Sequence, residues 1–143
     1  MANSAGICDS FKSEVLKGQH NFDVAGDSFK LSLYLTTATI SPTTTAYTAT
    51  GEVANSGTYA ATGSAVTNQA PATTSTVGHL TPSANVAWSS VTFTTDCALL
   101  YNDTDAGKAS VAAITFSPQT VTNGTFTLTM PTNDNTTGLI RLA

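Results

Sequence analysis

Charge is what this sequence has least of. Charged residues fill 10% of its 143 positions, against roughly 25% in an ordinary soluble domain, and the net charge is −4. A chain with this balance lacks the basic patch that binds a phosphate backbone, so we expect no nucleic-acid partner. It also lacks any run of about 18 apolar residues, so we expect no membrane-spanning helix and no membrane partner.

The charge is also unevenly distributed. Between Lys30 and Asp96 the one charged residue is Glu52, while threonine fills about one position in five of the whole chain. Solvated domains normally intersperse both signs of charge on their surface. A neutral hydroxyl surface therefore suggests that a partner covers part of it in the working state. The alternative is that threonine is here as a good strand former.

The first 20 residues predict one short amphipathic helix. Apolar residues recur there at helical spacing, at Ile7, Cys8, Phe11, Val15 and Leu16. Asn3 or Ser4 can cap the N-terminus of this helix, and Gly18 can end it. A helix this short must be held by packing against something apolar.

Beyond a polar turn at 21–27, alternating residues predict strands. We expect strands at 29–36, 86–88, 91–94, 97–101, 112–116, 126–130 and 139–142. A bulge at Ser89-Ser90 would explain the phase slip there, and Asn123-Gly124 is expected to turn the chain between two strands. Between 38 and 81 the pattern weakens, which favours short strands joined by long polar loops.

Many short strands at spacings of about ten residues predict an all-β fold, an antiparallel β-sandwich or jelly roll with one short N-terminal α-helix. We expect residues 1–143 to form a single domain, with 1–20 as an N-terminal helix or arm and 28–143 as the β-sandwich. The first six residues lack the basic and apolar regions of a secretory signal, so we expect synthesis in the cytoplasm.

Few residues could carry chemistry. Asp103 and Asp105 precede Gly107 as in a calcium loop, but Ile114 stands where the bidentate glutamate would come, so we interpret 102–107 as a turn and expect no metal. Cys8 and Cys97 could pair, yet in a reducing cytoplasm distant cysteines are more often buried thiols.

An enzyme is not expected, and neither is a cofactor. The chain has no Gly-x-Ser-x-Gly motif, and His20 and His79 are its only histidine bases. A small hydrolase that uses His20 or His79 is the third hypothesis. Trp88 and the tyrosines could form a platform that stacks on sugars, but its place between valine-rich strands predicts that Trp88 belongs to the core.

The order of several segments is familiar. They are FKSEVL at 11–16 followed by Gly18, His20 and Phe22, then GDSFKL at 26–31, ALLYND at 98–103, TVTNGTFTL at 120–128 and GLIRL at 138–142. In this order they resemble small β-sandwich structural proteins of tailed bacteriophages, of the capsid-decoration or cement kind. The similarity covers both ends of the chain, is weak in the middle, and includes no catalytic motif.

The resemblance implies a virion structural protein that is made in the host cytoplasm and ends on the capsid surface. Its implied partner is the major capsid protein, which it would bind across subunit joints as a homo-oligomer, with a trimer as the candidate assembly. The alternative is a tail or receptor-binding component that adheres to host-surface glycans.

Contacts with the partner are expected from the helix and from two uncharged loops, at 42–45 and 71–76, because polar loops on a rigid sheet are where recognition usually lies. The predicted contact residues are Ile7, Phe11, Val15, Pro42, Thr43, Thr44, Thr45, Pro71, Thr73 and Thr74.

Overall fold

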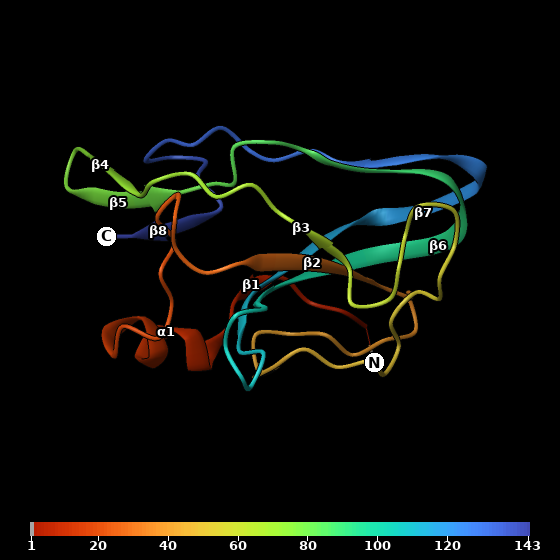
Figure 1. The fold of residues 1–143 in the computed structure, drawn as a ribbon, viewed down its shortest axis with the longest axis horizontal. Helices are drawn as coiled ribbons and strands as arrows, with labels where there is room; N and C mark the ends of the chain where they lie inside the picture. Colours follow the sequence, from red (N-terminus) through yellow and green to blue (C-terminus); the bar gives the residue numbers. More distant parts are fainter. Residues whose placement is uncertain (1) are drawn as a thin grey trace.

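The computed structural model describes residues 2–143 and confirms an all-β protein with one short helix (Figure 1). The chain forms, in order, β1 (Gly6–Ile7), α1 (Asp9–Leu16), β2 (Phe29–Tyr34), β3 (Ser64–Ala65), β4 (Ala72–Thr74), β5 (Val77–Leu80), β6 (Val86–Asn102), β7 (Ser110–Leu128) and β8 (Ile140–Leu142).

These strands make two antiparallel sheets. The larger has the order β1-β7-β6-β2-β3 and the smaller the order β4-β5-β8. The sheets meet where Phe29 and Leu100 of the larger and Leu80 and Ile140 of the smaller line one small pocket. All four side chains belong to a single hydrophobic core. The expected sandwich-like arrangement is therefore present, with the small sheet and α1 at the same end of the molecule (Figure 1).

A long hairpin of β6 and β7 lies at the centre of the larger sheet. The strands expected separately at 86–88, 91–94 and 97–101 are one continuous β6 of 17 residues. The expected bulge is confirmed, because the register with β7 shifts between Trp88 and Val91 and Ser90 has a φ of 56°.

The predicted turn at Asn123-Gly124 is wrong. β7 runs through these residues and stays paired with β6, with Gly124 opposite Val91 and Val121 opposite Phe93. Asn123 takes a φ of 46°, a left-handed conformation that a hairpin turn and a β-bulge both require. The dipeptide therefore predicted the left-handed conformation of Asn123 correctly. Because β7 pairs with β6 on both sides of it, the strand continues there and does not turn.

The N-terminal helix is shorter than predicted. Gly6 and Ile7 pair with β7 as β1, and Cys8 occupies the N-cap position of α1 without a side-chain cap. Asn3, expected as a cap, instead donates to the carboxylate of Asp96 at 2.6 Å and accepts from the backbone N–H of Ile40 at 2.9 Å. Pairing with an existing sheet gives the backbone of residues 6–7 its hydrogen bonds and outweighs the helical pattern.

The end of the helix is where the sequence placed it. Gly18 follows the last turn with a φ of 72°, the left-handed conformation that commonly ends helices. Leu16, expected on the buried stripe, is 88% exposed, which corrects that prediction. Phe11 and Val15 of the predicted stripe do face the core, Phe11 fully buried and Val15 partly.

Both faces of β2 are buried, although its sequence alternates between apolar and polar residues. Hydrogen bonds of two tyrosine hydroxyls, one from each side, hold the segment 47–62 against this strand. Tyr59 accepts the backbone N–H of Leu33 at 2.9 Å, and Tyr34 donates to the carbonyl of Thr48 at 2.7 Å. The expected short strands and long loops between 38 and 81 are present as β3, β4, β5 and their connections.

Candidate functional site

A groove with a volume of about 540 Å³ opens between α1 and the small sheet. Its walls are mainly apolar. The helix contributes Phe11 and Val15, and the small sheet contributes Gly78, Leu80 and Leu142. A volume of this size falls in the range of protein ligand sites, and a concave, mainly apolar surface is the usual character of such a site.

Four large hydrophobic side chains are exposed in the part of the chain that the structure describes, and one of them lines the groove. The large hydrophobic side chains that are exposed among residues 2–143 are Leu16 (88%), Val24 (70%), Leu142 (55%) and Leu35 (37%). Leu142 lines the groove, while Leu16 and Val24 are chain neighbours of the lining residues Val15 and Asp23. Leu35 follows the far end of β2.

The register of the small sheet makes one face of the groove. Gly78 lies between Thr73 on β4 and Leu142 on β8, and Leu80 lies opposite Ile140. A Cβ atom added to Gly78 would meet nothing closer than the Leu142 carbonyl oxygen, at 3.8 Å, which is an ordinary contact. The missing side chain at this position therefore leaves open space above the sheet.

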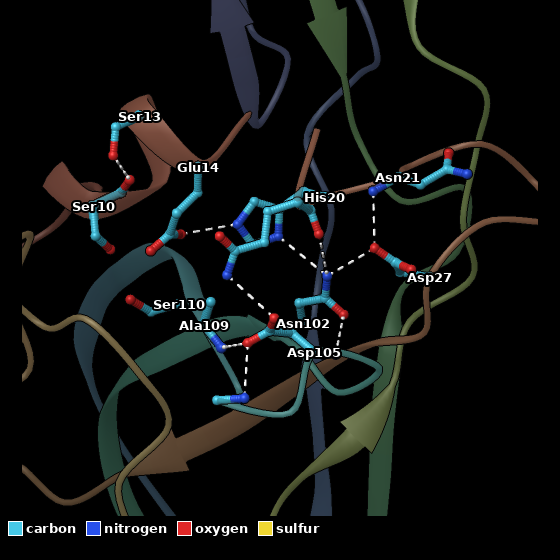
Figure 2. A network of polar contacts seen from close by, with 12 residues as sticks. Ser10, Ser13, Glu14, His20, Asn21, Asp27, Asn102, Asp105, Ala109 and Ser110 are labelled. Atoms are coloured by element: carbon cyan, nitrogen blue, oxygen red, sulfur yellow. Dashed lines mark hydrogen bonds and ion pairs between the residues drawn. The ribbon is translucent and has the colours of Figure 1, made fainter. Parts of the chain in front are cut away.

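A buried hydrogen-bond network lies at one wall of the groove (Figure 2). The side chain of His20 is fully buried, with Nε2 3.0 Å from Glu14 Oε2 and Nδ1 3.2 Å from Asn102 Nδ2. An amide nitrogen can only donate, so Nδ1 accepts and the imidazole proton is assigned to Nε2, which donates to Glu14. Both ring nitrogens are thereby occupied, and His20 joins α1 to the end of β6.

Asn102 is held in this orientation by the backbone around it. Its Oδ1 accepts the N–H groups of Thr104 at 3.0 Å and Asp105 at 3.1 Å, while its Nδ2 also donates to Asp27 Oδ2 at 2.8 Å. The amide cannot flip without losing these bonds. The network explains why the Asn102 side chain is buried at the end of a strand.

The second histidine also uses both ring nitrogens. His79 Nδ1 lies 2.9 Å from Asn133 Oδ1, which can only accept, and Nε2 lies 3.1 Å from Thr74 Oγ1, which therefore donates. A chain of hydroxyl, imidazole and side-chain oxygen is the order that activates a nucleophile. Thr74 and Asn133 do not line the groove, however. These hydrogen bonds connect the β4–β5 hairpin to the segment that follows β7.

Four of the predicted contact residues come together at the groove. Phe11 and Val15 on α1 face Pro71 and Thr73 across it, although they lie far apart in the sequence. The prediction that 71–76 is a loop is wrong, because 72–74 form the edge strand β4 and Thr74 is exposed on it.

The other predicted contacts lie elsewhere. Ile7 is in β1, and the loop of Pro42, Thr43, Thr44 and Thr45 is fixed to the start of β7. Ser110 donates its hydroxyl to the Thr44 carbonyl and its backbone N–H to the Thr45 carbonyl. The backbone N–H of Asp9 donates to the carbonyl of Pro42. This loop connects the N-terminal segment to the larger sheet.

The groove also contains residues that the sequence did not single out as contacts. Phe22, Gly78 and Leu142 were missed. A large apolar residue in a polar turn, such as Phe22, was a usable signal. Gly78 gave none, since a glycine in a strand has several structural explanations.

The segment 102–107 is the turn that the sequence predicted. Asp103 pairs with Lys108 at 2.9 Å and with Lys30 at 3.1 Å, and hydrogen bonds from these lysines lower the pKa of its carboxyl. Asp105 accepts the backbone N–H groups of Gly107 and Ala109. Residues 2–143 contain no cluster of three histidine, cysteine or acidic side chains that could hold a metal.

The two cysteines are free and fully buried. Burial raises the pKa of the Cys97 thiol to about 12 and also raises that of Cys8. Both residues therefore behave as small apolar side chains in the core, the reading that the sequence favoured over a disulfide.

The aromatic residues do not form a sugar-stacking platform. Trp88 is 1% exposed and packs edge-on against Tyr59, which confirms its predicted place in the core. Tyr34 and Tyr101 are also buried, and their hydroxyls donate to backbone carbonyls. Tyr47 is half-buried and donates to Glu52.

Comparison with known proteins adds no relative. No protein family, no curated protein and no solved structure matches this chain. In the part of the chain that the structure describes, no helix is long and apolar enough to cross a membrane.

Proposed function

We propose that this protein is a non-enzymatic virion structural protein of a tailed phage. It decorates the capsid and stabilises the head by binding across subunits of the major capsid protein as a homo-oligomer. The kind of protein that we propose follows from the order of segments, which resembles that of phage cement proteins. The groove is the proposed site of attachment.

The observation that carries the proposal is the apolar groove between α1 and the small sheet, together with the exposed large apolar side chains of the protein. Leu142 lines the groove and is 55% exposed, and Leu16 and Val24 are exposed next in the chain to the lining residues Val15 and Asp23. Their burial against a partner would be favourable at about 25 cal/mol per Å² of apolar surface. A stable attachment buries roughly 1,200–2,000 Å² in total, more than the groove alone offers, so neighbouring uncharged surface would take part.

The low charge of the surface supports the same function. Between Lys30 and Asp96 a partner would meet one charged residue, Glu52, and its carboxylate already accepts three hydrogen bonds within the protein. Threonine and serine hydroxyls can form hydrogen bonds across an interface without the cost of desolvating charges. Such a surface suits permanent contact with shell subunits.

The test mixes the purified protein with undecorated phage shells. We expect saturable binding and a rise in the temperature at which the shells come apart, because the ligand binds the assembled state and not the dissociated subunits. Absence of saturable binding would contradict the proposal. Binding to host cells or glycans in place of shells would favour the receptor-binding alternative.

A further inference from the structure

A hydroxyl, an imidazole and a side-chain amide are connected by hydrogen bonds at the β4–β5 hairpin, which lies at one end of the molecule (Figure 1). Thr74 Oγ1 lies 3.1 Å from His79 Nε2, and His79 Nδ1 lies 2.9 Å from Asn133 Oδ1. Both distances are within the reach of about 2.6–3.2 Å that joins a nucleophile to its base and the base to an orienting group. No other hydroxyl of residues 2–143 is hydrogen-bonded to a histidine ring. The three residues therefore stand in the order nucleophile, base and orienting group.

The two hydrogen bonds assign a role to each ring nitrogen of His79. With the amide oxygen of Asn133 at Nδ1, that nitrogen carries the imidazole proton and donates it, because a carbonyl oxygen can only accept. Nε2 then has a free lone pair and accepts the hydroxyl proton of Thr74. A general base needs this tautomer, since its lone pair must face the proton that leaves the nucleophile.

The imidazole and the Asn133 amide are held in place by their surroundings. His79 is buried in β5, which lies between β4 and β8. Gly138 packs against it so closely that a Cβ atom added there would lie 3.3 Å from the Cβ atom of His79. Asn133 lies in a turn whose next residue, Asp134, accepts hydrogen bonds from the backbone N–H groups of residues 136–137 at 2.8 and 2.6 Å. The base and its orienting group are therefore in position before any reactant arrives.

Thr74, in contrast, is open to solvent. It is exposed on β4, an edge strand of the small sheet, so a reactant can approach its hydroxyl from outside the fold. The next residue, Ser75, is also exposed, and its backbone N–H makes no hydrogen bond among residues 2–143. The backbone N–H of the residue after a nucleophile is a common donor to the oxyanion of acyl transfer. The hairpin therefore offers an accessible nucleophile and, next to it in the chain, a free donor.

We propose that Thr74 is an activated nucleophile that accepts one acyl group from an activated ester or thioester. Its Oγ1 attacks the acyl carbonyl and gives its proton to His79 Nε2. The bond between the acyl carbon and the leaving alcohol or thiol then breaks, and the leaving group takes the proton from Nε2. The products are an ester at Thr74 Oγ1, the free alcohol or thiol, and the original imidazole. The chain is modified once, so this site goes beyond the proposed function and does not depend on attachment to shells.

Acetylation of the folded protein with p-nitrophenyl acetate tests the proposal. Peptide mapping by mass spectrometry locates the acetyl groups, and alkaline hydroxylamine removes an ester but leaves lysine amides intact. Thr73 is the matched control, because it is exposed on the same strand and has no hydrogen bond to a histidine. We expect Thr74 to be acetylated about 100-fold faster than Thr73, since general-base catalysis contributes a factor of about 10²–10⁴.

Three variants separate an activated nucleophile from hydrogen bonds that only connect segments. Asn133→Ala leaves the hydroxyl and the imidazole in the protein and should slow acetylation at Thr74 about 10-fold or more, because the base loses its orienting group. Thr74→Ser keeps a hydroxyl and should keep the reaction, whereas Thr74→Val should lose it. Circular dichroism and urea unfolding of each variant establish that the fold is intact.

Three results would overturn the proposal. Equal rates at Thr74 and Thr73 in the wild-type protein would do so, and this comparison needs no variant. A stable acetyl group on His79 in place of Thr74 would show that the imidazole is itself the nucleophile. Folded Asn133→Ala that reacts at the wild-type rate would show that the hydrogen bonds only connect segments. Binding to shells is measured separately, so failure of this inference is distinguishable from failure of the proposed function.

Discussion

The carboxylate of Glu52 accepts hydrogen bonds from three residues of the segment 47–62 and so holds this segment together. One of these residues, Tyr59, also accepts a hydrogen bond from β2. Its Oε1 accepts the Tyr59 hydroxyl at 2.8 Å and the backbone N–H of Thr62 at 2.7 Å, and its Oε2 accepts the Tyr47 hydroxyl at 2.6 Å. Thr62 has a φ of 81°, an uncommon conformation for a β-branched residue that its surroundings must maintain. Removing the charge of Glu52 should therefore weaken a whole segment.

The substitution Glu52→Gln keeps the shape of the side chain, removes its charge and replaces one of its two acceptor oxygens by an NH2 group that only donates. Hydrogen bonds to a charged acceptor contribute about 1 kcal/mol more than neutral ones, so three bonds give about 3 kcal/mol. Glu52 is only partly buried, and solvent access reduces this figure to about 2 kcal/mol. That is a large part of the 5–15 kcal/mol that stabilises a typical domain.

Urea unfolding measures the effect. With a slope of about 2 kcal/mol per molar urea, the midpoint of Glu52→Gln should fall by about 1 M. Asp9→Asn is the matched control, since its carboxylate makes an exposed ion pair with Lys12, of a kind that contributes less than about 1 kcal/mol. A midpoint for Glu52→Gln no lower than that of Asp9→Asn would refute the reasoning.

Three further predictions concern the core. Burial raises the pKa of Tyr34 and of Tyr101 to about 12, above the ordinary value of 10. The contribution of these two hydroxyls to the free energy of unfolding is therefore complete below pH 10 and is lost as the pH rises to 12. Urea midpoints that stay constant over that range would contradict this. The thiols of Cys8 and Cys97 should resist a thiol-reactive reagent in the folded protein and both react in urea. Leu99→Ala, at a fully buried position of β6, should cost about 3 kcal/mol in unfolding free energy, and a loss below 1 kcal/mol would show that the core is looser than its packing indicates.

Local backbone features were predictable because they depend on neighbouring residues alone. Gly18 ends the helix, Ser89-Ser90 forms a bulge within β6, and 102–107 turns the chain, each with the conformation that these residue types favour. The turn at Asn123-Gly124 was predicted by the same reasoning and failed. A left-handed asparagine fits a turn and a bulge equally well, and the choice depended on β6, which is distant in sequence.

The candidate site was only half predictable for a related reason. Phe11, Val15, Pro71 and Thr73 were singled out separately, yet nothing in the sequence indicated that they line one groove. The loop 42–45 was singled out on the same grounds and lies against the start of β7. Composition identifies surfaces that are suited to binding, whereas only the chain path shows which of them meet.

The sequence by itself determined the all-β class, the single short helix and the burial of Trp88, because strand periodicity, a glycine stop and hydrophobic burial act over a few residues or through composition. The tertiary structure alone decided that residues 6–7 become a strand, that both faces of β2 are covered, and that Gly78 opens into a groove. Each of these depends on contacts between segments distant in sequence, where the energy of packing and pairing exceeds the local preference of the chain.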